Sequence, residues 1–407
     1  MDKSTRENAS YVVLARKWRP SQFSDVVGQD PIAQTLVNAI EAKRVHQAYL
    51  FTGSRGIGKT SIARIFSKLI RCNSTTGSAQ NRSLSSCDQC SSCLEVTSGK
   101  SVDVIEIDGA SNNGVDAIRE IRENANYLPS SGTKKIYIID EVHMLSTAAF
   151  NALLKTLEEP PAHILFIFAT TEPHKIPATI LSRCQRFDFR RVNYTQIQKR
   201  LIAITQAEGI TCPPEALALI ARAADGSMRD ALSLLDQSIA FSNGNMTLES
   251  VRESIGLIET QIIFEITKNI LNRNAHEAIH YVNQCYQQGF DLRVLTRHLI
   301  ECLHGVLLAK INAPFTESLG FNKEDWDKLK EVSQLRSLEE LEVIFQVLHH
   351  GIDSLARSSQ PQMVLDVLLI KCATAEILTP AHKPIPYQQQ NSIIAEKKNL
   401  QTTIVKT

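Results

Sequence analysis

Gly53-Ser54-Arg55-Gly56-Ile57-Gly58-Lys59-Thr60 separates the apolar run AYLFT from the segment SIARIFSKLI, which has helical periodicity. A Gly-rich loop between a strand and a helix is the setting that a phosphate-binding P-loop requires. Its backbone N–H groups wrap around phosphates, and the N-terminus of the following helix favours their negative charge. The alternative, an ordinary Gly-rich turn, needs neither the strand before it nor the helix after it. The sequence therefore predicts a triphosphate site at this loop.

The residues of this loop have distinct expected roles. Lys59 should reach the β- and γ-phosphate oxygens, and the Thr60 hydroxyl should ligate Mg²⁺. The residues expected to bind the nucleotide at this loop are Gly53, Gly56, Gly58, Lys59, Thr60 and Ser61.

Further β-rich runs follow the loop and alternate with helical patterns. Together with residues 48–53, the expected strands are 102–108, 134–140, 163–170 and 185–189. Most of these runs are continuously apolar, which is typical of strands that helices cover on both faces. The alternation predicts an α/β domain built on a parallel five-stranded sheet.

Two acidic residues, Asp140 and Glu141, end the expected strand 134–140. We expect Asp140 to hold Mg²⁺ through water and Glu141 to orient and polarise the water that attacks the γ-phosphate. The alternative is a strand that ends in solvent with two incidental acids, which the presence of the P-loop disfavours.

The strand 163–170 ends in Thr170-Thr171, where a hydroxyl lies beside the γ-phosphate in ATPases with this sheet order. Thr170 is slightly favoured as this sensor because it ends the apolar run, and Thr171 stays open. Arg183 in LSRC and Arg229 in GSMRDA are candidates to neutralise charge on the transferring phosphoryl group, since the planar guanidinium suits phosphate oxygens. From composition alone, a surface or salt-bridge role explains either arginine better.

A Cys-rich insertion offers four thiols: Cys87, Cys90 and Cys93 at regular spacing, with Cys72 upstream as the less secure fourth member. Four thiolates suit tetrahedral Zn²⁺, and such closed coordination leaves no position for a catalytic water. We therefore expect a structural zinc site. Free thiols in a Ser-rich loop and an iron–sulfur cluster are the alternatives.

The composition restricts which class of protein this chain can be. A chain of 407 residues with 43% hydrophobic content allows two or three domains. A net charge of +1 argues against a nucleic-acid coat protein, because counterion release rewards an excess of Lys and Arg. The N-terminus has no signal-peptide core, and the apolar runs are far shorter than the ~20 residues of a membrane span. We expect a cytoplasmic protein with no membrane partner, whose nine cysteines stay reduced.

The pattern of elements divides the chain into four segments. We expect an α/β domain at 1–191 with the Cys-rich module at 72–93, a small helical unit at 192–242, and a larger helical block at 243–378. Residues 379–407 are polar with interspersed prolines, so they are predicted to be disordered.

Several motifs together resemble one family, the gamma/tau subunits of bacterial DNA polymerase III, which are AAA+ clamp-loader ATPases. The motifs are ARKWRPSQFSDVVGQ (15–29), GSRGIGKTSIAR (53–64), the Cys quartet, IDGASNNGVDAIREI (107–121), IIDEVHMLSTAAFNALLKTLEEPP (138–161), ATTEPHKIPATILSRCQRF (169–187) and GSMRDALSLLDQ (226–237). The similarity is strong from about Tyr11 to Asp236 and weaker to about Leu378. A generic AAA+ protein would share the P-loop but not the other motifs together.

The resemblance implies a RecA-like AAA+ domain with a zinc-binding insertion, followed by a helical lid and an all-α collar that joins subunits into a ring-like pentamer. It implies that Arg183 reaches the ATP of the neighbouring subunit and that Arg229 contacts the nucleotide from the lid of its own subunit. The residues that it places near the adenine are Tyr11, Arg16, Trp18, Pro20 and Val27.

The resemblance also implies a function and partners. The chain would be an ATP-hydrolysing subunit of the DNA polymerase III holoenzyme that uses ATP, Mg²⁺ and Zn²⁺ and loads the sliding beta clamp onto primed DNA. Its partners would be the delta and delta-prime subunits, the beta clamp, primer–template DNA and further copies of itself. The sequence ends soon after the expected collar, as in a short gamma-like form, so no direct tether to polymerase or helicase is expected.

Two rival functions share part of this motif set. A branch-migration or helicase-type AAA+ motor would share the ATP site but form a closed homohexamer. A non-catalytic scaffold like delta-prime would share the zinc module and the SRC motif but lack an intact P-loop. Gly53, Gly58, Lys59 and Thr60 are all present and argue against the scaffold.

Overall fold

A computed structural model describes residues 11–74, 85–256, 259–315 and 323–375. The chain forms two compact units, Met1–Leu257 and Ile258–Thr407, which we describe separately. The expected disordered segment 379–407 and part of the expected Cys-rich module lie outside the described residues.

The first unit is built on a parallel five-stranded sheet, as the sequence predicts. The strands are β1 (Ala48–Thr52), β2 (Val104–Asp108), β3 (Lys135–Asp140), β4 (Ile164–Thr170) and β5 (Gln185–Asp188). Their order across the sheet is β2-β3-β4-β1-β5, and all neighbours run parallel. Because all the strands run parallel, the chain must cross over the sheet between consecutive strands, and helices form those crossovers.

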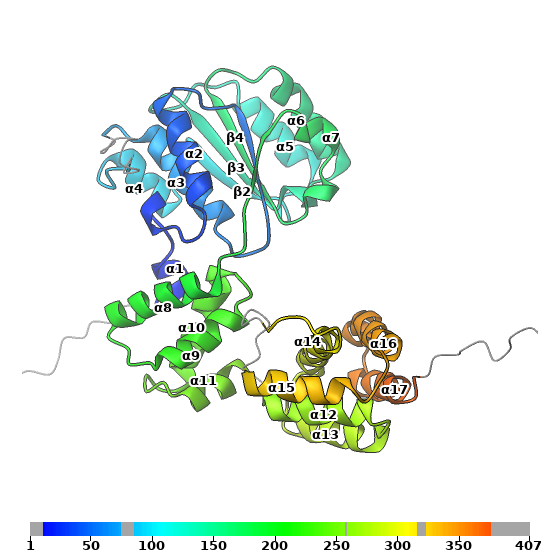
Figure 1. The fold of residues 1–407 in the computed structure, drawn as a ribbon. Coiled ribbons are helices and arrows are strands. Elements are labelled where there is room, and N and C mark those ends of the chain that lie inside the picture. The colour runs from blue at the N-terminus through cyan, green and yellow to red at the C-terminus, as the bar shows by residue number, and fades with distance from the viewer. Residues whose placement is uncertain (1–10, 75–84, 257–258, 316–322, 376–407) are drawn as a thin grey trace, which may run out of the picture. The chain divides into compact units, whose positions relative to one another are not determined.

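Helices cover both faces of this sheet, which confirms the predicted fold class. Figure 1 shows α2, α3 and α4 on one side of the sheet and α5, α6 and α7 on the other. The helices and 3-10 turns of this part are α1 (Leu14–Lys17), η1 (Phe23–Asp25), α2 (Asp30–Glu41), α3 (Lys59–Arg71), α4 (Ser91–Ser98), α5 (Val115–Asn124), η3 (Val142–Met144), α6 (Thr147–Glu158), η4 (Pro173–Lys175) and α7 (Ala178–Leu181).

Alternate residues of the strands supply two separate cores. Tyr49 and Leu165 point to the core shared with α2 and α3. Their neighbours Leu50 and Phe166 point to the opposite core, shared with α5, α6 and α7. The strands β1, β3 and β4 are buried on both faces, which explains why their segments are continuous apolar runs rather than alternating patterns.

The sheet order brings the expected catalytic segments together. β3, β4 and β1 are neighbours, and parallel strands end at the same edge of a sheet. Thr52 and Thr170 are register partners at the ends of β1 and β4. The P-loop after β1, the acidic pair at the end of β3 and the threonines at the end of β4 therefore meet at the carboxyl edge, the usual ligand position in open α/β sheets.

A group of four helices completes the first unit: α8 (Tyr194–Glu208), α9 (Pro214–Ala223), α10 (Met228–Phe241) and α11 (Leu248–Ile255). Val251 of α11 is fully buried in the same core as Leu217 of α9 and Leu235 of α10. α11, which lies beyond the expected boundary at residue 242, thus buries its apolar face against α9 and α10.

The second unit is all-helical in its described residues. Its helices are α12 (Thr260–Leu271), α13 (Ala275–Gln287), α14 (Leu292–Lys310), α15 (Lys323–Ser333), α16 (Leu338–Arg357) and α17 (Pro361–Ala373). One apolar core joins them, with Trp326 of α15 almost completely buried in it. No helix in the described ranges has the length and apolar character needed to cross a membrane.

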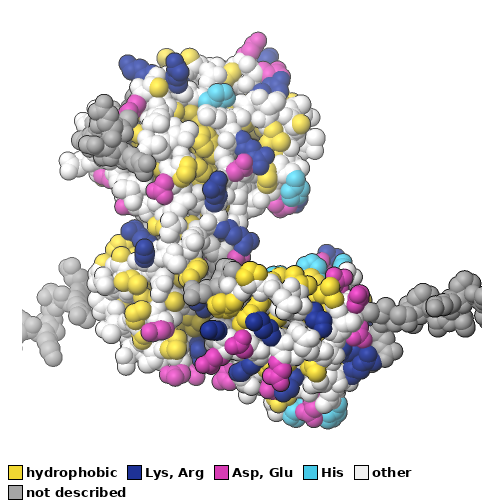
Figure 2. Space-filling model, in the orientation of Figure 1, with side chains coloured by type: hydrophobic (Ala, Val, Ile, Leu, Met, Phe, Trp, Pro, Cys, Tyr) yellow, Lys and Arg dark blue, Asp and Glu magenta, His cyan; other side chains and the backbone are white. Residues whose placement is uncertain are grey.

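The charges on the surface are mixed in sign. On the face drawn in Figure 2, basic and acidic side chains are interspersed, in keeping with the net charge of +1. This view shows no broad face of a single sign, so on this face electrostatic attraction to DNA would be restricted to small areas.

A buried ion pair fixes the end of α3 that lies away from the P-loop. The Arg71 guanidinium donates to Asp103 Oδ2 at 2.8 Å, and the two side chains are 0% and 4% exposed. Burial raises the pKa of Asp103, but hydrogen bonds from Ser130 and Ser131 and the charge of Arg71 outweigh it and hold the pKa below its usual value. The pair thus joins the P-loop helix to the start of β2 and to the loop before β3.

Replacing Asp103 with Asn should destabilise the first unit by about 3–5 kcal/mol, because the Arg71 charge would stay buried without its partner. The control is Asp116→Asn, which removes the exposed partner of Arg119 and should leave stability nearly unchanged. Scanning calorimetry of the full chain measures both shifts. Equal shifts for the two variants would contradict the stabilising role of the buried pair.

Candidate active site and metal centre

The P-loop begins where β1 meets β4 and β5, and the close packing there demands glycine. The Gly53 N–H donates to Thr170 O at 3.2 Å, and Gly53 has φ of +139°. A Cβ on this residue would lie 2.7 Å from both Ile57 Cδ1 and Phe189 O. Any side chain would therefore push the loop away from the sheet, which explains this glycine of the motif.

Lys59 lies inside the loop that should hold the triphosphate. Its side-chain Nζ donates to Gly53 O at 2.7 Å and Ser54 O at 2.8 Å, and the residue is 5% exposed. Burial lowers the pKa of Lys59, while the charges of Glu141 and Asp140 oppose that shift. The ammonium group is thus held by carbonyl oxygens within the loop, where phosphate oxygens can replace them as partners.

Thr60 and Asp140 form the candidate magnesium site. The Thr60 hydroxyl donates to Asp140 Oδ2 at 2.7 Å across the gap between the start of α3 and the end of β3. The other carboxylate oxygen of Asp140 accepts the N–H of Glu141 at 3.0 Å. A hydroxyl and a carboxylate are the hard oxygen ligands that Mg²⁺ prefers, usually together with water and phosphate oxygens.

Glu141 has a strained backbone and a carboxylate with defined partners. Its φ is +45°, in the left-handed region that few non-glycine residues adopt. Its Oε2 accepts the N–H of Thr171 at 3.2 Å and the Thr171 hydroxyl at 3.1 Å. The carboxylate is therefore oriented by the end of β4, beside the P-loop.

The two candidate sensor threonines lie in different surroundings. Thr170 is fully buried, and its hydroxyl accepts the N–H of Glu172 at 3.0 Å and contacts His143 Nδ1 at 3.0 Å. Thr171 is partly exposed and faces Glu141. The two hydroxyls therefore have different partners, His143 for Thr170 and Glu141 for Thr171. The apolar run alone did not reveal this difference.

Arg229 lies where the helical unit touches the P-loop. Its backbone N–H donates to Gly56 O at 3.3 Å, at the start of α10. Gly56 has φ of +77°, and a Cβ there would lie 2.0 Å from Ser227 Oγ, the N-cap of α10. The Arg229 side chain is exposed. The contact through backbone and cap thus sets Arg229 beside the phosphate-binding loop.

The N-terminal segment expected around the adenine is attached to the helical unit. The Tyr11 hydroxyl donates to Asp236 at 2.6 Å, and this bond raises the pKa of Tyr11 to about 12. The Trp18 indole donates to Glu208 at 2.7 Å. Val27 packs against the core of the helical unit, whereas Arg16 is exposed. These contacts attach the N-terminal segment to the helical unit.

Arg19 is a site residue that the sequence did not single out. Its guanidinium Nε lies 3.4 Å from the Ser61 hydroxyl on the P-loop helix. Burial lowers the pKa of Arg19, with a further contribution from the charge of Arg64. Arg19 lies within the quoted ARKWRP motif, but nothing in the spacing of that motif distinguishes it from its basic neighbours.

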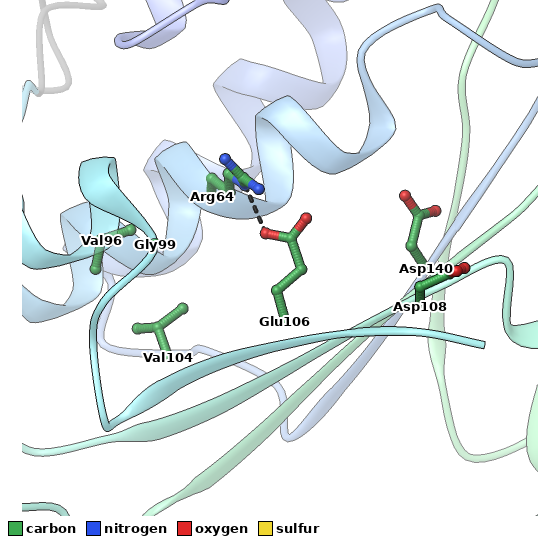
Figure 3. Close-up of a pocket in the computed structure, with 7 residues that line it drawn as sticks. All are labelled: Arg64, Val96, Gly99, Val104, Glu106, Asp108 and Asp140. Atoms are coloured by element: carbon green, nitrogen blue, oxygen red, sulfur yellow. Dashed lines mark hydrogen bonds and ion pairs between the residues drawn. The ribbon is translucent and has the colours of Figure 1, made fainter. Parts of the chain in front are cut away.

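A cavity of about 390 Å³ lies beside the candidate magnesium site. Figure 3 shows Asp140 next to Asp108 and the ion pair between Arg64 and Glu106 on the side toward α3. Its remaining lining residues are Val96, Gly99 and Val104. The cavity gives water access to the carboxyl edge at Asp140.

Arg183 points away from the P-loop of its own chain. Its guanidinium donates to Glu158 Oε1 at 2.7 Å and to Thr179 O at 2.6 Å, so it lies between α6 and α7. Its side chain is 33% exposed. An arginine in this place is available to a neighbouring molecule if it leaves Glu158.

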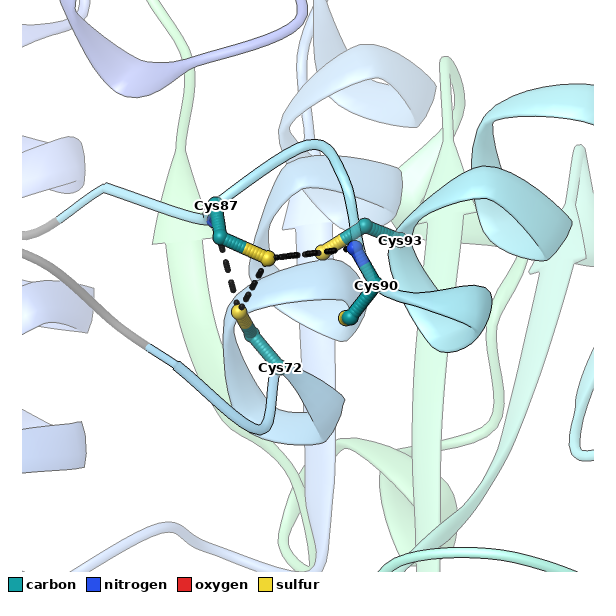
Figure 4. A group of neighbouring side chains, drawn as sticks. All are labelled: Cys72, Cys87, Cys90 and Cys93. Carbon is teal, nitrogen blue, oxygen red and sulfur yellow. Dashed lines mark hydrogen bonds between the residues drawn. The ribbon is translucent and has the colours of Figure 1, made fainter.

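The four predicted cysteines come together. Their Sγ atoms all lie within 4.8 Å of one another, with Cys72 and Cys87 3.5 Å apart and Cys87 and Cys93 3.9 Å apart (Figure 4). Four sulfurs about 2.3 Å from a central Zn²⁺ would be separated by roughly 3.8 Å. The quartet therefore fits a tetrahedral metal, and Cys72 belongs to it despite its distance in sequence.

The Cys quartet is joined to the P-loop helix. Asp88, next to Cys87, pairs with Lys68 of α3 and accepts a hydrogen bond from Gln22. Backbone N–H groups of Gln89 and Cys90 lower the pKa of Cys87 to about 6. The turn between the cysteines thus favours thiolate and is anchored to the helix that carries the P-loop.

Three family models match successive parts of the chain. Residues 28–193 match "DNA polymerase III, delta subunit", residues 196–244 match "DNA polymerase III clamp loader subunit, ATPase lid domain", and residues 246–385 match "DNA polymerase III subunits gamma and tau domain III". The DNA polymerase III subunit gamma of Buchnera aphidicola subsp. Baizongia pistaciae is 36% identical over 368 residues, which cover 89% of this chain and 96% of that protein. The chain belongs to the gamma/tau family of DNA polymerase III subunits.

Longer members of the gamma/tau family are also similar. The DNA polymerase III subunit tau of Bacillus subtilis is 45% identical over 374 residues, which cover 90% of this chain and 64% of that protein. The subunit tau of Escherichia coli is 37% identical over 381 residues, covering 93% of this chain and 58% of that protein. The chain thus spans less than two thirds of these tau subunits. The predicted resemblance to the gamma/tau subunits is confirmed.

Proposed function

We propose that this chain is an ATP-hydrolysing subunit of the DNA polymerase III clamp loader, which uses ATP to load the sliding beta clamp onto primed DNA. The observation that carries the proposal is the Thr60–Asp140 contact, with Lys59 inside the P-loop and Glu141 beside it. In a member of the gamma/tau family, these groups would form a triphosphate–magnesium pocket. A delta-prime-like scaffold would not need this intact set.

The pocket supplies the parts that phosphoryl transfer requires. When bound, Mg²⁺ neutralises charge on the β- and γ-phosphates, and Thr60 and Asp140 would hold it. Lys59 would exchange its carbonyl partners for phosphate oxygens. Glu141 would orient and polarise the attacking water, with Thr171 fixing its carboxylate. Positioning and charge stabilisation of this kind account for most catalysis in P-loop ATPases.

The nucleotide would be enclosed from two sides of the same chain. Arg229 at the start of α10 would contact the phosphates, since its backbone already touches Gly56. The segment that includes Tyr11, Arg16 and Val27 would enclose the base, and its attachment to α8 and α10 supports a shared movement with the lid.

Loading of the clamp would require several subunits in one complex. Arg183 would complete the ATP site of the next subunit, because it points away from its own P-loop. The partners would be delta, delta-prime, further copies of this chain, the beta clamp and primer–template DNA, with the second compact unit as the collar. The N-terminus of α5, after Ser111-Asn112-Asn113, would donate N–H groups to DNA phosphates. Different affinities of the ATP and ADP states for clamp and DNA would drive loading.

Lys59→Ala should abolish ATP binding, whereas Glu141→Gln should leave binding intact and stop turnover. Of these two residues, only Lys59 would contact the bound nucleotide before the reaction begins. Binding is measured with a fluorescent ATP analogue. Turnover is measured on the chain assembled with delta and delta-prime, with clamp and primed DNA added separately and together. Equal loss of binding in both variants would overturn these roles. Turnover unaffected by clamp would favour the branch-migration alternative.

Arg183→Ala should spare ATP binding but lower hydrolysis in the assembled complex by about 10³-fold or more, the range for an arginine finger supplied by a neighbour. Arg186→Ala is the control, since Arg186 is exposed nearby and pairs with Asp188. The ATPase rates of the isolated chain and of the assembled complex distinguish action across an interface from action within one chain. An equal effect in the isolated chain would show that Arg183 does not act across an interface.

The chain should contain one structural Zn²⁺, held by Cys72, Cys87, Cys90 and Cys93. Metal analysis of the purified chain should give one equivalent, and Cys72→Ser should lower it and reduce thermal stability, because metal-binding free energy contributes to folding. Cys212→Ser in the helical unit is the control and should retain the metal. Iron with a visible absorption band would indicate a cluster instead.

A further inference from the structure

His143 lies in the η3 turn, which follows Glu141 at the carboxyl edge of the sheet. Its ring is 6% exposed. The ring Nδ1 lies 3.0 Å from Thr170 Oγ1 and 3.4 Å from Glu141 Oε2. On the opposite side, Nε2 lies 3.3 Å from Glu172 Oε1. One buried ring therefore contacts both the carboxylate expected to activate water and the segment that follows β4.

The ring has polar contacts on both sides. Its Nδ1 lies 3.0 Å from the Thr170 hydroxyl, whose oxygen also accepts the N–H of Glu172 at 3.0 Å. Its Nε2 faces the Glu172 carboxylate. Thr170, His143 and Glu172 therefore form a continuous series of polar contacts.

The ring also restricts the position of Glu141. The Glu141 carboxylate accepts two hydrogen bonds from Thr171, from the N–H at 3.2 Å and from the hydroxyl at 3.1 Å. The ring fills the space on the other side at 3.4 Å. Glu141 is thus confined between a pair of donors and an aromatic edge.

The backbone at the start of this series of contacts is fixed as well. The N–H of Met144 donates to Glu141 O at 2.9 Å, which closes the turn that brings the ring back under β4. At the far end, Glu172 is paired with Lys175 at 2.8 Å. The ring therefore lies between two anchored segments, with little freedom to move without moving Glu141 or Glu172.

We propose that His143 is a positioning residue that holds the Glu141 carboxylate against Thr171 and ties it through Thr170 and Glu172 to the end of β4. The inference rests on the proposed ATPase function, since it assigns the support of its water-activating group. His143 does not touch the nucleotide in this scheme. Its effect is on the orientation of Glu141 and hence on turnover.

His143→Ala in the full chain, assembled with delta and delta-prime, tests the proposal. The turnover number for ATP should fall about 10- to 100-fold, the range typical when a group that orients a catalytic residue is removed, while affinity for the fluorescent ATP analogue stays unchanged. His174→Ala is the matched control: His174 also faces Glu172 but is 73% exposed, and its loss should leave turnover at the wild-type level. A parallel loss of affinity, or unchanged turnover in His143→Ala, would overturn the proposal.

Two conservative variants separate positioning from simple packing. In His143→Asn the amide can replace Nδ1 and keep the contact with Thr170, so most of the turnover should return. In His143→Gln the amide reaches toward Glu172 and leaves Thr170 without its partner, so less should return. If both recover equally, or if Gln recovers more than Asn, the assigned series of contacts is wrong.

A double variant connects the effect to Glu141. In a Glu141→Gln background, His143→Ala should lower the residual turnover no further, since the group that it positions is already lost. A further loss by the same factor as in the wild-type background would show that His143 acts independently. Normal turnover in Glu141→Gln alone would instead refute the proposed function, so the two failures are distinguishable.

Discussion

The meeting of three strand ends at one edge of a parallel sheet is the constraint on which the site depends. β3, β4 and β1 are neighbours, so a hydroxyl from the start of α3 reaches a carboxylate at the end of β3 at 2.7 Å. The order of the strands requires helical crossovers, and these helices bury both faces of the sheet. The rigid, dry sheet then holds polar groups at its edge within hydrogen-bond distance without spending free energy on ordering them.

The structure connects the catalytic edge to its surroundings at three points. The N-cap of α10 touches Gly56, so the helical unit rests on the P-loop itself. The Cys quartet reaches α3 through Asp88 and Lys68. Below the sheet edge, His143 joins Glu141 to the segment after β4. Each contact reaches a segment that is expected to bind phosphate or to orient water. A change in the helical unit, the Cys quartet or the segment after β4 can therefore alter the geometry of the pocket.

The sequence predicted most of the fold because periodicity and the P-loop setting are local signals. The five strands and the positions of Lys59 and Asp140 at the carboxyl edge follow from runs of a few residues, and spacing alone identified Cys87, Cys90 and Cys93. Tertiary packing decided the rest. Thr171 rather than Thr170 faces Glu141 because the chain turns just after β4, and α11 joins the helices before it because its apolar face fits there. No local pattern marks His143 or Arg19, whose surroundings come from distant segments.

Tyr11 and Trp18 are hydrogen-bonded to α10 and α8, which belong to the same helical unit that contacts the P-loop through the start of α10. The segment expected near the base and the helix expected near the phosphates are therefore attached to each other and should move together. A ligand with only a base, or only a triphosphate, would contact this unit at one place and would stabilise its closed position only weakly. Selectivity for a complete nucleotide would then resemble the binding of a bivalent ligand. The contacts to the base and to the phosphates would each be weak alone, and binding would be strong only when one molecule makes both.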